Sequence, residues 1–347
     1  MTARLEERAK AHAYAVGFDL AGIASLGPAD TAPAFARWLE AGYAGDMHYL
    51  SRGAARRCDT QALVPEARSA IVVGLDYGGR APTGPVARYA RGNDYHHVML
   101  GKLTELGRLL AAEAGRPVRG KAYVDTGPVL ERDLARRAGL GWFGKNTNLI
   151  HPDRGSFFFI GALFLDLALQ PDDPFAADRC GSCTRCLEAC PTEALVAPYR
   201  LDATRCISYL TIELKGPIPE ALRPLVGELL YGCDICQDVC PWNVKFSREL
   251  ESPELAPRKD VTNPEPRELI ALDDAAFLAR FRGSPVKRAK RRGLARNAAV
   301  AMGNRRDPRD LPALKRAAAN DPDPMVREHA AWALAQFGRA AISKLDT

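Results

Sequence analysis

Eight of the nine cysteines lie between residues 180 and 240, and their spacing constrains the fold of that region more than any other feature. The first run is Cys180-Gly-Ser-Cys183-Thr-Arg-Cys186-Leu-Glu-Ala-Cys190-Pro191, and the second is Cys233-Asp-Ile-Cys236-Gln-Asp-Val-Cys240-Pro241. Both follow the C-x2-C-x3-C-P cadence of bacterial ferredoxins, in which the last cysteine of a run is turned toward the neighbouring cluster. The second run lacks a first cysteine, and Cys206 can supply it.

The spacing divides these cysteines into two sets of four ligands. The first cluster takes Cys180, Cys183, Cys186 and Cys240, and the second takes Cys190, Cys206, Cys233 and Cys236. A zinc site is the alternative, but zinc takes its ligands in two pairs and has no use for this cadence. The pattern therefore predicts two 4Fe-4S clusters that carry electrons one at a time. Cys58 is left over, and we interpret it as a buried small hydrophobe.

The cysteine pattern also bears on the compartment. Clustered cysteines are typical of metal binding in the cytosol, whereas a secreted protein spreads them to staple loops. The charged first ten residues predict an amphipathic helix and not a secretory signal. The most apolar run, residues 156–169, is broken by Asp166 and is shorter than the ~20 residues of a membrane helix. We therefore expect a cytoplasmic monomer without a membrane span.

Periodicity divides the chain into parts of different structure. Helical periodicity occurs at 5–16, 33–41 and 95–114, and β-rich runs occur at 18–24, 69–75, 121–124 and 156–165. The prediction is an α+β fold in four parts. These are a mixed α/β domain at 1–169, a ferredoxin-type double-cluster domain at 170–248, a linker and connecting helix at 249–281, and a helical tail at 282–347.

The tail carries a basic block and a weak repeat. Residues 282–306 contain nine Lys or Arg residues and no acidic one, although the net charge of the whole chain is only +6. Such a block suggests a polyanion partner, whereas charge alone favours the alternative of a solvated helix face. Segments 297–303 and 329–335 align, and paired helices with small residues at the seam resemble a HEAT-like unit. Two such segments cannot stand alone, so we expect the tail to pack on the body.

Two segments upstream of the cysteines carry candidate catalytic groups. Asp125 follows a predicted strand and precedes a Thr-Gly-Pro turn, where a single carboxyl can be aimed into a cleft. Taken alone, it fits better as the N-cap of a helix beginning near Pro128. His96 and His97 lie at a predicted helix start and, from the residues alone, are ordinary helix-start residues. The glycine-rich segment 139–146 lacks the P-loop spacing.

Four long motifs resemble those of the epoxyqueuosine reductase family. They are Val-Asp-Thr-Gly-Pro-Val-Leu-Glu-Arg at 124–132, Gly-Trp-Phe-Gly-Lys-Asn-Thr at 141–147, Cys-Ile-Ser-Tyr-Leu-Thr-Ile-Glu-Leu-Lys-Gly at 206–216 and Tyr-Gly-Cys-Asp-Ile-Cys-Gln-Asp-Val-Cys-Pro-Trp-Asn at 231–243. The resemblance covers almost the whole length. It implies a base-off cobalamin in the first domain, whose fold would resemble the cobalamin domain of reductive dehalogenases. The two clusters would then reduce that cobalamin.

The resemblance also implies a reaction and partners. The reaction is the reduction of epoxyqueuosine to queuosine at the wobble position of tRNA, the last step of queuosine biosynthesis. The opened epoxide oxygen needs a proton, and the acid that matches the family motif is Asp125. We expect desolvation beside cobalamin to raise the pKa of Asp125 and keep part of it protonated near neutrality. The implied partners are a tRNA anticodon stem-loop and an external electron donor of the flavodoxin or ferredoxin type.

Further site positions are carried over by the same resemblance. Those expected at cobalamin are Arg57, Ala87, Asp125, Leu149, Ile160, Ser208, Cys233 and Asp234. Those expected beside the substrate are Asp94, Tyr95 and His96, and those expected at the tRNA backbone are Lys215, Lys287, Arg288, Lys290, Arg291, Arg292 and Arg296. Backbone phosphates attract clustered basic side chains.

Two other functional interpretations stay open at this point. One is a corrinoid iron–sulfur reductase of a small molecule, similar to a dehalogenase. The other is an electron carrier without chemistry of its own. The basic tail favours the tRNA-modifying reductase over the first alternative, because a small substrate needs no such surface. The position of Asp125 at a strand end argues against the second.

Overall fold

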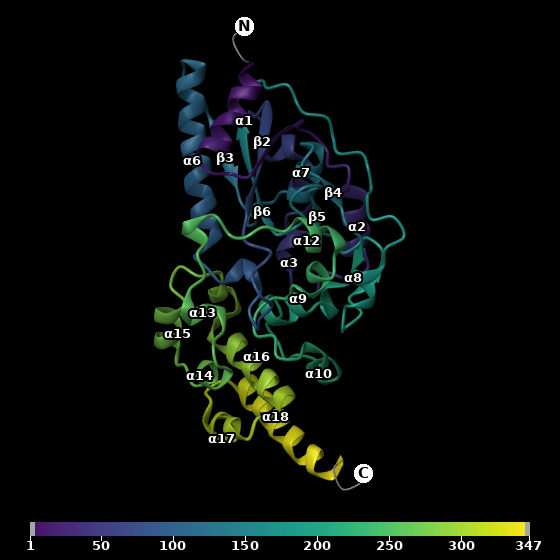
Figure 1. The fold of residues 1–347 in the computed structure, drawn as a ribbon, viewed down its shortest axis with the longest axis vertical. Coiled ribbons are helices and arrows are strands. Elements are labelled where there is room, and N and C mark those ends of the chain that lie inside the picture. The colour runs from purple at the N-terminus through teal and green to yellow at the C-terminus, as the bar shows by residue number, and fades with distance from the viewer. Residues whose placement is uncertain (1–3, 344–347) are drawn as a thin grey trace.

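Three parts follow one another along the long axis of the molecule (Figure 1). The structure is a computed structural model, and it describes residues 4–343. A layered part with a sheet lies at the N-terminal end, the cysteine-rich part lies beside and below it, and the last helices of the chain form the opposite end. No helix in the described range is long and apolar enough to cross a membrane.

The N-terminal part is built on a four-stranded antiparallel sheet with the strand order β1-β2-β6-β3. The strands are β1 (Leu20–Ala24), β2 (Ser69–Asp76), β3 (Gly120–Tyr123) and β6 (Phe158–Leu165). Successive side chains alternate between two core clusters, with Ile71 and Val73 in one and Ala70 and Val72 in the other. Both faces are therefore covered, which explains why β2 and β6 have continuous apolar sequences.

Helices cover both faces of this sheet. α1 (Leu5–Ala15) and α6 (Tyr95–Ala114) lie on one face, and α7 (Glu131–Arg137) lies on the other. α6 approaches the sheet closely because Gly161 has no side chain: a Cβ there would lie 3.0 Å from Met99 Cε. The remaining elements of this part are α2 (Ala32–Glu40), α3 (His48–Arg52), α4 (Ala54–Cys58), α5 (Thr60–Leu63), η1 (Arg88–Ala90), β4 (Trp142–Phe143) and β5 (Leu149–Ile150). The three predicted helices and four predicted strands are confirmed, with ends shifted by about two residues at most.

The cysteine-rich part consists of short helices joined by loops. Its elements are α8 (Arg185–Glu188), β7 (Leu195–Ala197), β8 (Arg200–Leu201), η2 (Ala203–Arg205), α9 (Ile207–Ile212), η3 (Glu220–Leu222), α10 (Arg223–Val226), α11 (Ile235–Asp238) and α12 (Pro241–Phe246). Two cysteines stand at helix starts. Cys206 is the N-cap of α9, and Cys240 is the N-cap of α12, with Pro241 at the first helical position.

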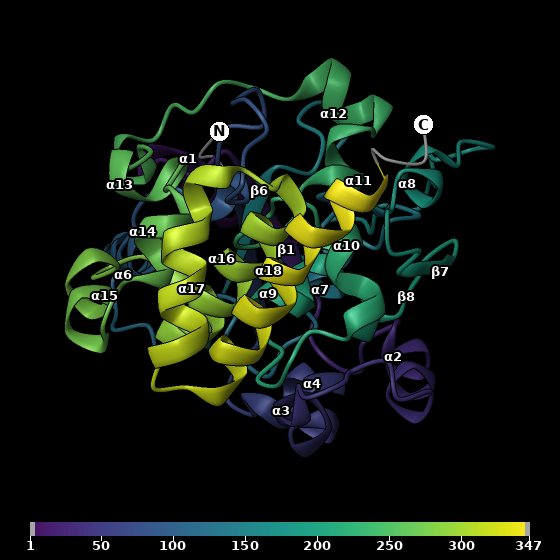
Figure 2. The ribbon, with the colours of Figure 1, turned by 90° about the horizontal axis from the view of Figure 1, so that it is seen from below.

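The C-terminal end is a packed set of helices, seen at the front in Figure 2. It comprises η5 (Pro285–Ala289), α16 (Lys290–Arg305), η6 (Pro308–Asp310), α17 (Leu311–Asn320) and α18 (Pro324–Ser343). α18 packs on both α16 and α17. Small residues form the seam: a Cβ at Gly303 would lie 2.7 Å from the Trp332 ring. This is the helix pairing that the repeat of 297–303 with 329–335 predicts. The end of the predicted tail, 344–347, lies outside the described residues.

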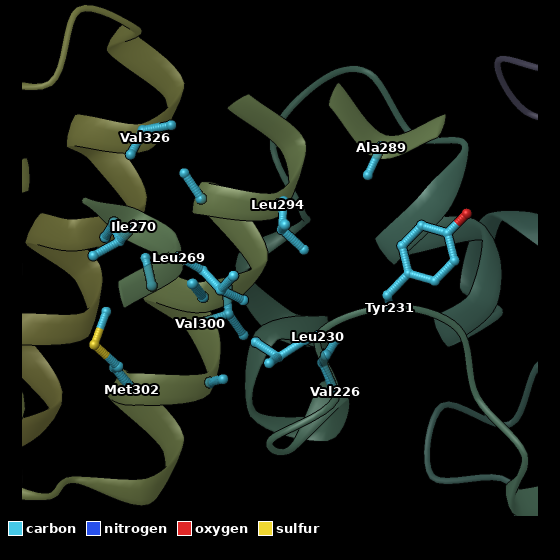
Figure 3. Packing of buried hydrophobic residues seen from close by; sticks show 14 of the residues in the cluster. Val226, Leu230, Tyr231, Leu269, Ile270, Ala289, Leu294, Val300, Met302 and Val326 are labelled. Atoms are coloured by element: carbon cyan, nitrogen blue, oxygen red, sulfur yellow. The ribbon is translucent and has the colours of Figure 1, made fainter. Parts of the chain in front are cut away.

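One hydrophobic cluster joins the tail to the cysteine-rich part (Figure 3). It includes Leu230 and Tyr231 from the cysteine-rich part and Leu294 and Val300 from α16. Asn297 adds hydrogen bonds between the two parts, because its Nδ2 donates to the carbonyl oxygens of Thr211 (2.8 Å) and Leu230 (2.9 Å). The prediction that the tail packs on the body is confirmed.

The segment at 249–281 is more ordered than a linker. It contains η4 (Pro253–Leu255), α13 (Lys259–Thr262), α14 (Pro266–Ile270) and α15 (Asp274–Arg280). Leu255 and Val261 are buried, each in a different core cluster. The proline and acidic residues of this segment predict irregular backbone. They do not show that Leu255 and Val261 pack the segment against the rest of the protein.

Candidate active site and electron relay

The four cysteines of the first predicted set line one cavity. Its lining residues are Lys145, Asn146, Ile150, Cys180, Cys183, Cys186, Cys240, Pro241 and Trp242. Lys145 Nζ donates hydrogen bonds to the carbonyl oxygens of Gly181 (2.6 Å) and Cys183 (3.0 Å), which holds the cysteine loop in place. Burial, followed by the charges of the neighbouring thiols, raises the pKa of Cys186 to about 11. Positively charged iron is what such a group of thiols needs to stay deprotonated.

The second predicted set is also brought together, and it lies next to the first. Burial and then the charges of Cys206 and Cys190 raise the pKa of Cys233 to about 12. The charges that act on Cys236 come from Cys233 and Cys206 and also from Cys186 of the first set. Cys236 therefore lies within electrostatic range of the other three cysteines of its predicted set and of Cys186, and the division into two sets of ligands stays a prediction made from the spacing.

Within residues 4–343, no group of three or more His, Cys, Asp or Glu side chains converges closely enough to hold one metal ion. In a cubane each thiolate ligates a different iron, so a 4Fe-4S cluster needs its four thiols further apart than the ligands of a single zinc.

A buried ion pair joins the second set to the sheet domain. Arg88 donates to Asp234 Oδ2 from its backbone nitrogen (2.9 Å) and from Nη1 (3.0 Å). Burial raises the pKa of Asp234, and the hydrogen bonds and charge of Arg88 oppose that rise. A second link comes from Asn146, whose Nδ2 donates to the Cys236 carbonyl oxygen at 3.3 Å. In the sequence, only its position next to Ala87 marks Arg88 as a candidate site residue.

Asp125 lies in the loop between β3 and α7 in a left-handed backbone conformation, with a φ of +56°. Its backbone N–H donates to Glu131 Oε1 at 2.5 Å. The interpretation of Asp125 as a helix N-cap is wrong, because α7 begins at Glu131 and its N-cap residue is Leu130. The carboxylate of Asp125 therefore does not cap a helix, and the Asp125 side chain is 63% exposed.

Arg57 holds the loop that carries Asp125. Its buried Nη1 donates to the carbonyl oxygens of Gly127 (3.1 Å) and Val129 (3.2 Å), just after Asp125. A backbone turn with a non-glycine residue at positive φ persists only where its surroundings hold it. Arg57 and Glu131 together supply that support for Asp125.

His96 lies between two carboxylates. Its Nδ1 is 2.7 Å from Asp94 Oδ1, and its Nε2 is 3.4 Å from Asp125 Oδ2. Asp94 is the N-cap of α6 and also accepts the backbone N–H of His96 at 3.1 Å. Tyr95, which is buried, stacks on the His96 ring with centroids 4.1 Å apart. The structure thus brings Asp94, Tyr95 and His96 together with Asp125.

The charges in this group decide where the proton lies. Neighbouring groups partly desolvate the Asp125 carboxylate, which acts to raise its pKa, but the hydrogen bond and charge of His96 outweigh this effect, so the pKa of Asp125 is lowered. The expectation of a partly protonated Asp125 concerns the site with cobalamin bound and stays a prediction. Burial alone would lower the pKa of His96, but hydrogen bonds to Asp125 and Asp94 and the charges of both raise it to about 9. Near neutral pH the proton lies on His96.

The positions expected at cobalamin are placed as follows. Leu149 in β5 is buried, Ile160 in β6 is half-buried, and both belong to the apolar packing of one sheet face. Ala87 is buried before η1, and its N–H donates to the Tyr231 carbonyl oxygen at 2.8 Å. Ser208 lies in α9, and Cys233 and Asp234 lie just before α11.

One unpaired polar atom allows a test of whether a corrinoid fits here. Within residues 4–343, Arg57 Nε is buried without a hydrogen-bond partner, whereas His96 Nε2 faces Asp125 Oδ2 at 3.4 Å. Leaving a buried donor unpaired costs about 1–3 kcal/mol, so a bound group with oxygen acceptors would relieve that cost. The amide side chains of a corrin ring are such acceptors, and the apolar Leu149 and Ile160 suit its face. The residues present fit the cofactor.

The basic residues of the tail divide into two groups. Lys215, Lys287, Arg288, Lys290 and Arg292 are exposed. Arg291 and Arg296 are buried, which removes both from the predicted phosphate contacts. Arg291 forms two hydrogen bonds to Asp321, at 2.8 and 2.7 Å, and removing one partner of such a buried pair costs about 3–5 kcal/mol. Arg296 donates to the carbonyl oxygens of Leu214 and Gly216, and so holds the backbone on both sides of Lys215.

Arg288 lies where the tail meets the Asp125 region. Its guanidinium pairs with Glu213 at 2.9 Å and lies 5.6 Å from the centre of the Tyr49 ring. Its charge also helps to lower the pKa of Asp125. Sequence analysis missed Tyr49 and Glu213, because nothing local in the sequence shows that they meet Arg288. The candidate substrate surface therefore draws on three distant segments of the chain.

The fold and the site define an iron–sulfur oxidoreductase in which a double-cluster module joins a catalytic α/β domain to a basic helical tail. Family comparisons describe the parts in the same way. Residues 57–126 match the family described as Epoxyqueuosine reductase QueG, residues 179–243 match a 4Fe-4S double cluster binding domain, and residues 287–346 match HEAT repeats.

Similar proteins cover nearly the whole chain. Epoxyqueuosine reductase of Xanthomonas campestris is 42% identical, over 95% of this chain and 96% of the relative. The Escherichia coli K12 enzyme is 39% identical, over 96% of this chain and 89% of the relative. A crystal structure of epoxyqueuosine reductase with an epoxyqueuosine-modified tRNA-Tyr stem loop matches with a TM-score of 0.88 and 33% identity, covering 96% of this chain and 90% of that one. The chain belongs to the epoxyqueuosine reductase family.

Proposed function

We propose that this protein reduces epoxyqueuosine in tRNA to queuosine, the last step of queuosine biosynthesis. The observation that carries the proposal is the 42% identity to a curated epoxyqueuosine reductase over 95% of the chain. That match spans the Asp125 loop, the double-cluster module and the basic tail together. A solved relative has an epoxyqueuosine-modified stem loop bound, and its chain matches 96% of this one.

The reaction sets the tasks that the residues perform. An epoxide becomes an alkene and water when two electrons and two protons are added. The two cysteine sets would deliver the electrons singly. Arg57, Leu149, Ile160 and Ser208 would hold a bound cobalamin, which would supply the chemistry that breaks the carbon–oxygen bonds. Asp125, aimed from its strained loop, passes protons to the leaving oxygen.

The proposed roles follow the order of the chain. Residues 1–169 hold cobalamin and Asp125, residues 170–248 hold the clusters, residues 249–281 connect, and residues 282–347 bind tRNA. In the first cluster the ligands are Cys180, Cys183, Cys186 and Cys240, and in the second they are Cys190, Cys206, Cys233 and Cys236. A monomer with these parts needs only an external one-electron donor of the flavodoxin or ferredoxin type, and it would work in the cytoplasm, where its tRNA substrate is modified.

A direct assay tests this function. The reconstituted protein, with cobalamin and a chemical reductant, is incubated with tRNA that contains epoxyqueuosine, and the digested nucleosides are analysed by mass spectrometry. We expect epoxyqueuosine to be replaced by a nucleoside that lacks one oxygen atom. Unchanged epoxyqueuosine in a preparation with a full complement of iron and cobalamin would refute the proposal.

The alternative is a corrinoid reductase of a small molecule. Such a reductase would use the same combination of a corrinoid and iron–sulfur clusters. That combination does not distinguish a small-molecule substrate from tRNA. The exposed basic side chains of Lys287, Lys290 and Arg292 favour tRNA as the substrate. They lie on the tail, and the tail contacts the start of α6, where the Asp94 N–H donates to the Gly283 carbonyl oxygen at 2.8 Å. A polyanion on this surface would reach the Asp125 region.

The basic surface leads to a prediction on tRNA affinity. The double variant Lys287→Gln/Lys290→Gln is expected to weaken tRNA binding about tenfold at physiological salt and to reduce the slope of log affinity against log salt by about 2. Each exposed lysine that contacts a phosphate releases about one counterion, so the slope counts contacts. Affinity measured by fluorescence anisotropy over a salt series gives both quantities.

A matched variant controls for net charge. Lys315→Gln/Arg316→Gln removes the same charge from exposed positions on α17. We expect this variant to bind tRNA with the wild-type salt slope. Equal effects of the two variants would mean that the tail attracts tRNA only through its overall charge and that Lys287 and Lys290 are part of a solvated face.

A further inference from the structure

The proposed reaction has a proton requirement that Asp125 alone does not meet. Two electrons enter from the 4Fe-4S module, which an external one-electron donor reduces. Both carbon–oxygen bonds of the epoxide break, a carbon–carbon double bond forms, and the oxygen takes two protons and leaves as water. Asp125 holds at most one proton, and its lowered pKa means that near neutral pH it holds little of that one. Another group must supply protons to it.

Resting on the proposed function, we infer that His96 is the proton reserve of this site, which transfers a proton to the Asp125 carboxylate each time Asp125 has given one to the substrate oxygen. The two protons pass along the same route, and His96 takes a proton from water between them. His96 acts through Asp125 and is a positioning and proton-supplying residue.

The arrangement of the ring nitrogens supports this role. Asp94 Oδ1 lies 2.7 Å from Nδ1, and Asp125 Oδ2 lies 3.4 Å from Nε2. A neutral imidazole carries one N–H, so it can donate to only one of two carboxylates, whereas imidazolium donates to both. With a carboxylate facing each nitrogen, the imidazolium form is favoured. A proton is therefore stored one short transfer away from Asp125.

The two carboxylates have different environments, which gives the transfer a direction. Asp94 caps α6 and accepts a backbone N–H there, where the helix dipole stabilises its negative charge. The Asp94 carboxylate therefore stays ionised and keeps Nδ1 protonated. Asp125 is 63% exposed and makes the longer contact, so the Nε2 proton is the one free to move.

The surrounding charges are consistent with a stored proton. The titratable and charged groups that act on His96 or its two partners include Asp94, Tyr95 and His97 at the start of α6, Asp125 in the loop before α7, Glu131 and Arg132 in the first turn of α7, and Arg288 in η5. Burial and the charge of Asp125 raise the pKa of Glu131 to about 8, so Glu131 adds little negative charge near neutral pH. The two ionised carboxylates outweigh burial and keep His96 charged.

A pH profile distinguishes proton supply from a structural role. In the wild type, turnover is expected to fall above about pH 9, because His96 then loses its proton. His96→Gln is expected to lower single-turnover rates about 10²-fold at pH 8 and to lack that alkaline limb, with its rate rising toward acid pH as solvent protonates Asp125 directly. Iron content should stay at the wild-type level, and the single-turnover rate at saturating protein separates a loss of proton supply from any loss of tRNA affinity.

The neighbouring histidine provides the control. His97 is exposed on the same turn of α6, and His97→Gln is expected to keep the wild-type rate and pH profile. A His96→Gln variant with the wild-type rate and alkaline limb would overturn the inference while the proposed function stood. A wild type that makes no queuosine would instead overturn the proposed function.

A titration tests the inference without turnover. In protein labelled with ¹⁵N-histidine and free of cobalamin, the His96 ring is expected to titrate near pH 9. In Asp125→Asn, its midpoint should shift toward the ordinary value of 6.5, because one of the two carboxylates is lost. A His96 midpoint at or below 6.5 in the wild type would overturn the inference, whatever the fate of the His96→Gln variant.

Discussion

Asp125→Asn is expected to lower turnover of epoxyqueuosine-containing tRNA by about 10²–10⁴-fold, while tRNA affinity and iron content stay unchanged. The reason is that an amide cannot accept a proton from His96 and pass it to the substrate oxygen. Single-turnover nucleoside analysis at saturating protein measures the chemical step, so a loss of rate there cannot be attributed to weaker binding.

Asparagine is the better substitution because of the backbone at this position. Asp125 has a φ of +56°, a conformation that asparagine adopts readily and alanine does not. Asp125→Ala would combine the loss of the carboxylate with about 1 kcal/mol of backbone strain in the loop. A large loss in both variants points to the carboxylate. A loss in alanine alone would show that the loop conformation matters and that the carboxylate does not transfer protons.

Cys206→Ala is expected to halve the iron content, from about eight to about four atoms per chain, and to abolish reductive turnover. Cys206 is the cysteine that neither C-x2-C run contains, and its charge acts on Cys233 and Cys236 in the buried second set. Without its fourth thiolate the second cluster is lost, and electrons can no longer pass from the first cluster to the reaction. Iron analysis and electron paramagnetic resonance after anaerobic reconstitution measure the outcome.

The ninth cysteine supplies the matched control. Cys58 lies at the end of α4, is partly buried and belongs to neither set. Cys58→Ser should keep about eight irons and wild-type turnover. Eight irons in Cys206→Ala would show that another group completes the second cluster, and the assignment of ligands from spacing would then be wrong.

Much of the local structure could be predicted because its causes are local. The helix at 95–114 has an aspartate at its N-cap and a glycine in the left-handed conformation at its end, both of which are readable in the sequence. The cysteine cadence predicts the two thiol sets because a cubane imposes its own geometry on a short loop. The strands β2 and β6 were recognisable because burial on both faces leaves no polar alternation.

The prediction failed where the answer depends on distant neighbours. Arg291 and Arg296 belong to the same basic block as Lys290 and Arg292, yet α16 is the central helix of the tail, and Arg291 and every residue from Gly293 to Gly303 are buried. The charge pattern of the sequence does not show which face of α16 is covered by α9, α10 and α18. Burial therefore separates structural arginines from those that can meet a phosphate.

The sequence by itself determined the iron–sulfur chemistry, the helices and strands that surround it and the basic character of the tail. These properties follow from residue type and short-range spacing. Only the tertiary structure decided that Asp125 is ionised and open to solvent, and that the proton beside it lies on His96. The physical reason is that a pKa is set by burial and charge within a few ångströms, and α6, the Asp125 loop and η5 reach that distance only when the chain is folded.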